Sequence, residues 1–154
     1  MIIEIKNILN EINTDLKGEN RSVWTKTIKQ RLAELGNSLD CKTCASGIDS
    51  DTGEFLFDLI LYQGDNLLNS IELAMECEWN RSLGSIYYDF EKLLTTNAKQ
   101  RLLICQASSE NVEELRNKFK AYISNYSLLK QGSKFLIAIW IQEDEKFKYI
   151  ELQK

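Results

Sequence analysis

The spacing of the apolar residues changes period along this chain, and this change constrains the fold more than any other feature of the sequence. Apolar residues that recur every three or four positions are typical of helices packed on one side, whereas alternating or continuous apolar runs are typical of strands. The helical spacing occurs in four segments: residues 2–17, 22–36, 86–99 and 110–126. The strand pattern occurs in six segments: residues 39–43, 55–62, 71–79, 102–105, 135–141 and 147–152.

The resulting element order, ααβββαβαββ, predicts an α/β protein with a single mixed β-sheet flanked by helices. Three strands form a meander, and a helical crossover then leads into the wholly apolar segment 102–105, which suits a strand covered on both faces. The second helix is expected to begin after Ser22 and to end at Gly36. A length of 154 residues fits a single domain over residues 1–154.

The chain contains no histidine, and this excludes whole classes of site. Ser-His-Asp and Cys-His nucleophile pairs, histidine general acid–base catalysis and histidine metal sites all require that residue. Any chemistry must therefore come from carboxylates, lysine, cysteine, tyrosine, serine or threonine. The formal net charge of −4 argues against a highly basic nucleic-acid coat protein and leaves a local basic face open.

The number of cysteines and the N-terminal sequence indicate the cellular compartment in which the protein is expected. Four cysteines are too few and too scattered for a disulfide-stapled secreted scaffold. The N-terminal segment lacks the basic region and cleavage site of a signal peptide, and no apolar run approaches the roughly 18–20 residues of a membrane span. We therefore expect a cytoplasmic protein that is not inserted in a membrane.

Asp58 is the most informative polar residue, because it interrupts the apolar run of the 55–62 segment. A carboxylate is costly to bury unless it is paired, hydrogen-bonded or bound to a metal. The next predicted strand contains Glu76 and Glu78, two positions apart and therefore on one face. If the two strands pair, Asp58 and Glu76 can converge and form a hard-oxygen site that suits Mg²⁺ or Mn²⁺. Such an ion can activate a water and stabilise charge on a phosphodiester.

Simpler interpretations of these residues remain open at this point. Glu72, Glu76 and Glu78 can be the solvated face of an amphipathic strand. Asp58 can bond backbone amides or pair with an arginine, without any metal.

The runs FLFDLILY, ELAMECEWN, DFEKLLTTNAKQ and RLLICQ together resemble the PD-(D/E)xK nuclease superfamily, whose fold is that of the restriction endonucleases. That family has an αβββαβ core, with a metal-binding Asp on the second strand and an E-x-K motif on the third. The resemblance covers about residues 21–107, which leaves an N-terminal helix and a C-terminal αββ extension outside the core. It implies that Asp58 and Glu76 bind the metal, with the backbone carbonyl of Cys77 as a further ligand.

The chain departs from the family pattern at two positions. Glu78 stands where the family has lysine, so the motif reads E-C-E, and Phe57 rather than proline precedes Asp58. Three alternatives follow from the resemblance. Glu78 acts near the attacking water, as in family members that have E-x-E; the lysine has moved to the following helix as Lys92; or catalysis has been lost.

Basic residues on both sides of the motif favour a phosphate-binding surface. The candidates are Lys26, Lys29, Arg31, Lys42, Arg81, Lys92, Lys99 and Arg101. Trp79 beside the acidic pair can stack on a base or belong to the core.

The resemblance, together with the carboxylate pattern, thus implies a Mg²⁺- or Mn²⁺-dependent nuclease acting on DNA or, second, on RNA. The alternative is a non-catalytic protein of the same fold that serves as an interaction, immunity or scaffold module. The acidic composition and the missing motif lysine favour that alternative. A homodimer is also possible, because the apolar helix at 2–17 can supply an interface.

Overall fold

A computed structural model describes residues 1–65 and 68–154 of the chain. The element order is the predicted ααβββαβαββ, and the six strands form one mixed sheet in which they are hydrogen-bonded in sequence order, β1-β2-β3-β4-β5-β6. The chain divides into two compact units, Met1–Ala74 and Met75–Lys154, and the division falls within β3 (Ser70–Glu78). Among the described residues, no helix combines the length and the apolar character needed to cross a membrane.

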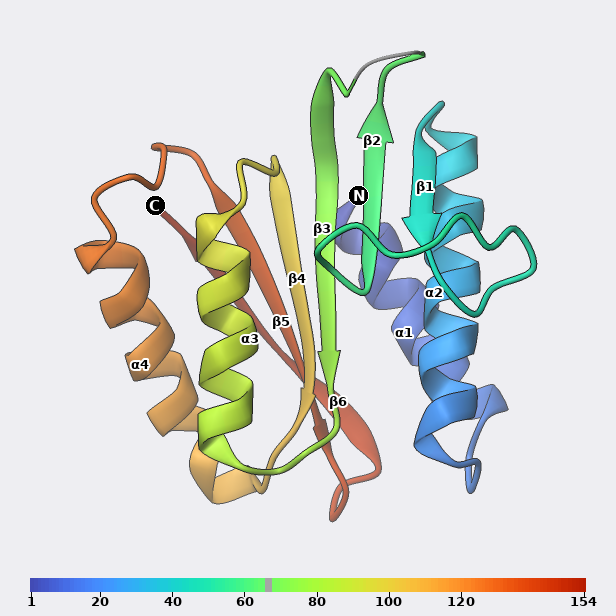
Figure 1. Ribbon diagram of the computed structural model, residues 1–154. Coiled ribbons are helices and arrows are strands. Elements are labelled where there is room, and N and C mark those ends of the chain that lie inside the picture. The colour runs from blue at the N-terminus through green and yellow to red at the C-terminus, as the bar shows by residue number, and fades with distance from the viewer. Residues whose placement is uncertain (66–67) are drawn as a thin grey trace. The chain divides into compact units, whose positions relative to one another are not determined.

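The first unit packs two helices on a strand pair. Its elements are α1 (Ile2–Asp15), α2 (Arg21–Ser38), β1 (Lys42–Ala45), β2 (Leu59–Gln63) and the first half of β3. Strands β1 and β2 are antiparallel, with Cys44 opposite Ile60, and α2 runs alongside β1 (Figure 1). The helical stripes predicted from the sequence are buried: Ile5, Leu9 and Ile12 from α1, and Trp24, Ile28 and Leu32 from α2.

The predicted ends of α2 were wrong at both termini. The helix is capped by Asn20, whose side chain accepts a hydrogen bond from the Val23 amide at 3.1 Å, and it continues past Gly36 to Ser38. Gly36 serves close packing rather than termination, because a Cβ added there would lie 2.6 Å from a Cδ atom of the buried Leu61. The glycine lets α2 approach β2 closely.

The loop from Ser46 to Glu54 is fixed by polar contacts rather than by regular structure. The Asp51 carboxylate accepts hydrogen bonds from the Gly47 amide at 2.8 Å and the Gly53 amide at 2.9 Å. Both bonds lower the pKa of Asp51, and the bond from the Gly47 amide has the larger effect. The loop leads directly to the residues that precede β2.

This hydrogen bonding predicts a pH-dependent contribution of Asp51 to stability. A carboxyl whose pKa is lowered by folding stabilises the native state above its unfolded pKa of about 3.9, and this stabilisation is lost as the pH falls through the folded pKa. Asp51→Asn should therefore lower the melting temperature at neutral pH, and the difference from the wild type should shrink as the pH falls below about 4. Thermal melting across this range checks the prediction, with Ser50→Ala as a non-titrating control. A difference that stays constant with pH would contradict it.

The second unit packs two helices on the remaining strands. Its elements are the end of β3, α3 (Leu83–Thr95), β4 (Gln100–Gln106), a short 3₁₀ turn (Ser109–Asn111), α4 (Val112–Asn125), β5 (Lys134–Ile141) and β6 (Lys146–Gln153). Strands β4 and β5 are parallel and β5 and β6 are antiparallel, while α3 and α4 lie side by side against them (Figure 1). Stacked rings of Phe90 and Phe119, with centroids 4.1 Å apart, lie at the centre of this core.

Candidate functional site

A buried carboxylate on β3 meets a lysine from α3. The Lys92 Nζ lies 2.5 Å from a Glu76 carboxylate oxygen, and the Glu76 side chain is only 4% exposed. Lys92 is also 3.7 Å from an Asp89 carboxylate oxygen one helical turn earlier, and Asp89 is largely buried as well. We call Glu76, Asp89 and Lys92 the β3–α3 cluster. With all three ionised, it keeps a net negative charge and can attract a cation.

The helical period of α3 explains why two of these residues point the same way. The buried stripe of α3 consists of Ile86, Phe90, Leu93 and Leu94. Asp89 and Lys92 are three positions apart, so their side chains are neighbours along one edge of that stripe. The apolar stripe packs into the unit and brings this polar edge to the carboxylate of Glu76.

Arg101 of β4 holds the C-terminal end of α3. Its Nε donates to the Leu93 carbonyl at 3.0 Å, one of its Nη atoms donates to the Thr96 carbonyl at 2.6 Å, and its guanidinium lies 4.9 Å from the Phe135 ring centroid. Burial lowers the pKa of Arg101 to about 10, so it stays charged at neutral pH. These bonds anchor the helix turn that carries Lys92.

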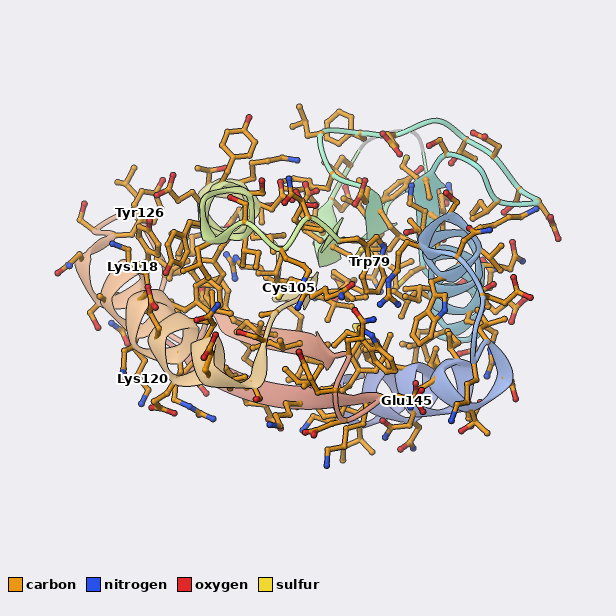
Figure 2. All side chains as sticks on the ribbon, turned by 90° about the horizontal axis from the view of Figure 1, so that it is seen from below. Trp79, Cys105, Lys118, Lys120, Tyr126 and Glu145 are labelled. Atoms are coloured by element: carbon orange, nitrogen blue, oxygen red, sulfur yellow. The ribbon has the colours of Figure 1, made fainter. Side chains whose placement is uncertain are left out.

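Glu78, two positions after Glu76, has a different environment from Glu76. Its carboxylate accepts a hydrogen bond from the Asn80 amide at 2.6 Å, in the turn that follows β3. Burial, and to a lesser degree the charge of Glu78, raise the pKa of the Cys105 thiol on β4. Trp79, between Glu78 and Asn80, is half-buried and, like Cys105, belongs to the second unit; both residues are labelled in Figure 2.

The prediction that Asp58 lies inside a strand was wrong. Strand β2 begins at Leu59, and Asp58 is the half-buried residue directly before it. A tight turn precedes Asp58, with Leu56 in the left-handed region at φ 64°. Asp58 belongs to the first unit and Glu76 to the second, so their expected convergence remains a prediction.

The interpretation of the β3 glutamates as a solvated face was also wrong. Glu72 and Glu76 are buried, and Glu78 is half-buried. The Ser70 hydroxyl donates to Glu72 at 2.6 Å, so this second buried carboxylate is hydrogen-bonded within its own strand. The sequence alternation identified β3 correctly, but both faces of this strand are covered.

Two of the basic residues proposed to face phosphate do not lie on a surface. Lys29 is buried and pairs with Glu54 at 2.9 Å, while Arg101 is buried under α3. Exposed lysines occur elsewhere, as at Lys118 and Lys120 on α4 (Figure 2). The sequence could not separate these cases, because lysine and arginine stems are readily buried when the charged group has a partner.

Asp89 is the site residue that the sequence reasoning missed. The signal was present, because Asp89 lies three residues before Lys92 in a segment with helical spacing. An acid and a base on one edge of a helix are common on surfaces, however, so only the burial of Asp89 distinguishes this pair.

The β3–α3 cluster offers carboxylate oxygens as possible ligands to a cation. Within residues 1–65 and 68–154, no three His, Cys, Asp or Glu side chains are grouped to hold a metal ion. Magnesium commonly binds through one or two carboxylates, with waters and substrate phosphates completing its octahedron. Glu76 and the Cys77 backbone carbonyl, both in the second unit, would supply oxygen ligands of this kind, and a contribution from Asp58 of the first unit remains a prediction.

Comparison of the chain with protein-family models, curated proteins and solved structures gives no match.

Proposed function

We propose that this protein is a divalent-metal-dependent phosphodiesterase that acts on nucleic acid, with a restriction-endonuclease-like core of the PD-(D/E)xK type. The observation that carries the proposal is the short contact between buried Glu76 and Lys92 of the following helix. This contact supports the idea that the motif lysine, replaced by Glu78 on β3, has moved to α3. The order αβββαβ within the observed fold is consistent with it.

Each residue of the proposed site has a distinct role. Asp58 and Glu76 would hold Mg²⁺ or Mn²⁺ with the Cys77 carbonyl, and Lys92 would stabilise the charge on the attacked phosphate. Asp89 orients Lys92, and Glu78 would position the attacking water. When bound, the divalent ion would supply charge stabilisation and a more acidic water.

A cleavage assay tests the proposal directly. Single-stranded and duplex DNA and RNA are incubated with Mg²⁺, Mn²⁺ or a chelator, using the wild type and the near-isosteric variants Glu76→Gln and Asp58→Asn. Metal-dependent cleavage should fall at least about 100-fold in each variant, because an amide replaces a charged metal ligand and loss of electrostatic stabilisation typically costs about 100- to 1,000-fold in rate. Glu113→Gln, which changes an exposed carboxylate on α4, is the matched control and should cleave normally.

Metal binding can be measured separately from cleavage. Mn²⁺ at about 100 times its Kd should stabilise the wild type by about 2.7 kcal/mol and the Glu76→Gln variant by much less. The proposal is wrong if the wild type shows no metal-dependent cleavage of any substrate, or if Glu76→Gln cleaves as fast as the wild type.

A non-catalytic interaction module is the second candidate, and one observation favours it. The Glu78 carboxylate already caps the Asn80 amide, which is a structural role that needs no substrate. In that case Glu76 and Lys92 form a structural ion pair, and Mn²⁺ should leave the melting temperature unchanged.

A further inference from the structure

An apolar turn lies immediately before Asp58, and most of it is exposed. This apolar turn consists of Phe55, Leu56 and Phe57. Phe55 is 47% and Leu56 75% exposed, while Phe57 is buried. A bridge between Phe55 and Phe57 closes the turn and leaves Leu56 at its tip. Two large apolar side chains thus face solvent beside a candidate metal ligand.

The backbone at the tip is held in a conformation that leucine rarely adopts. Leu56 has φ 64°, a backbone conformation that suits glycine or asparagine and is unfavourable for leucine. Strained backbone persists where the surrounding structure over-determines it. Phe57 anchors one end of the turn in the core, and the Lys29–Glu54 pair anchors the other. The leucine side chain is therefore kept at a position where local conformation favours other residues.

An apolar hollow lies beside the turn on the first unit. It has a volume of about 230 Å³ and is lined by Phe55 together with Ile60 and Tyr62 of β2. Ile60 pairs in register with Cys44, another lining residue, so the hollow covers one face of the β1–β2 pair. Aromatic and aliphatic groups around a shallow hollow suit a flat, unstacked ring.

Three acidic residues of the first unit pair with lysines. Glu54 pairs with Lys29 at 2.9 Å. Lys26 lies 3.7 Å from Asp49, and Lys42 lies 3.4 Å from Asp65. This local compensation weakens the repulsion that the acidic composition would otherwise exert on a phosphate backbone.

We propose that the apolar turn and its hollow bind unstacked bases, so that the substrate is a single-stranded or locally unpaired nucleic acid. The inference depends on the proposed function, because Asp58 follows the turn directly and its Cα can lie at most about 7 Å from that of Leu56. A strand whose phosphate reaches Asp58 therefore has bases within reach of Phe55 and Leu56. Proteins that bind single strands or unstack bases use exposed aromatic and aliphatic side chains in this way.

The test is binding measured apart from cleavage, on the intact chain. A labelled single-stranded DNA of about 20 nucleotides and the matching duplex are titrated by fluorescence anisotropy with Glu76→Gln as the background, so that the probe is not cut. Leu56→Asn keeps a residue that tolerates positive φ but removes the apolar tip. Leu128→Asn changes a similarly exposed leucine, 78% exposed, in the second unit and is the matched control.

We expect the background protein to bind the single strand more tightly than the duplex. Leu56→Asn and Phe55→Ala should each weaken single-strand binding about 5- to 30-fold, since loss of a stacking contact has effects of this size. The slope of log affinity against log salt should not change, because no phosphate contact is removed. The melting temperature of Leu56→Asn should be unchanged or higher, which separates lost binding from lost folding.

Single-strand affinity within twofold of the background in Leu56→Asn would overturn the inference, even if the protein cleaves nucleic acid. A change in sedimentation coefficient on Leu56→Asn would also overturn it, because the turn would then contact a second copy. Leu56-dependent single-strand binding without metal-dependent cleavage would support the inference and contradict the proposed function.

Discussion

Replacing Lys92 with methionine is expected to lower the free energy of unfolding by about 3 kcal/mol. The substitution keeps an unbranched apolar stem and removes the ammonium that lies 2.5 Å from Glu76. Removing one member of a buried ion pair typically costs about 3–5 kcal/mol, because the remaining charge has lost its partner in a medium of low polarity. We expect the lower end of this range, since the Lys92 side chain is 34% exposed and solvent screens part of the interaction.

Removing the carboxylate of Glu76 instead should lower the free energy of unfolding less. This asymmetry would identify the unpaired buried carboxylate as the cause of the loss in Lys92→Met. Glu76→Gln leaves a lysine that can turn toward solvent, so we expect a loss of about 1 kcal/mol. The double variant should be more stable than Lys92→Met alone, because it no longer holds a buried carboxylate beside an apolar residue. Urea unfolding of the wild type, the two single variants and the double variant gives the coupling energy between Glu76 and Lys92 directly. A Lys92→Met variant within about 0.5 kcal/mol of the wild type would contradict a buried pair at this site.

The order of helices and strands could be predicted from the sequence because it depends on the spacing of apolar residues along the chain. Buried stripes such as Ile5, Leu9 and Ile12 in α1 identify a helix without any knowledge of what covers it. The continuous apolar run of β4 indicates a strand that is buried on both faces. The order of these segments then leaves few ways to form a sheet.

The errors occurred where tertiary contacts override local pattern. Glycine is typical of a position just after a helix end, but Gly36 lies inside α2. It is a glycine because the side chain of Leu61 packs closely against this position. Residues 55–57 have the composition of a strand, but Phe57 is buried while Leu56 turns outward with positive φ. Glu76 alternates like a surface residue, and its ion pair with Lys92 helps to explain why it can be buried. Such pairings depend on residues far apart in sequence, and periodicity contains no information about them.

Replacing Arg101 with methionine is expected to destabilise the protein by about 3 kcal/mol. Two hydrogen bonds from a charged donor to the Leu93 and Thr96 carbonyls would be lost, each worth about 1.5–3 kcal/mol. Relief of the charge burial that lowers the pKa of Arg101 to about 10 offsets part of this loss. Arg101→Lys should also destabilise, because an ammonium cannot reproduce the planar fork that reaches both carbonyls.

This substitution should also affect the candidate site, because Arg101 bonds the carbonyl of the residue next to Lys92. Hydrogen exchange in the last turn of α3 should accelerate in Arg101→Met more than in the rest of the unit, and cleavage should fall while Mn²⁺ still binds. Arg116→Met on α4, which removes a surface pair with Glu113, is the control and should change stability by less than about 0.5 kcal/mol. If Arg101→Met unfolds at the same guanidinium concentration as this control, Arg101 does not anchor α3. Lys92 would then depend for its position on the apolar stripe of α3 and on the carboxylates of Glu76 and Asp89.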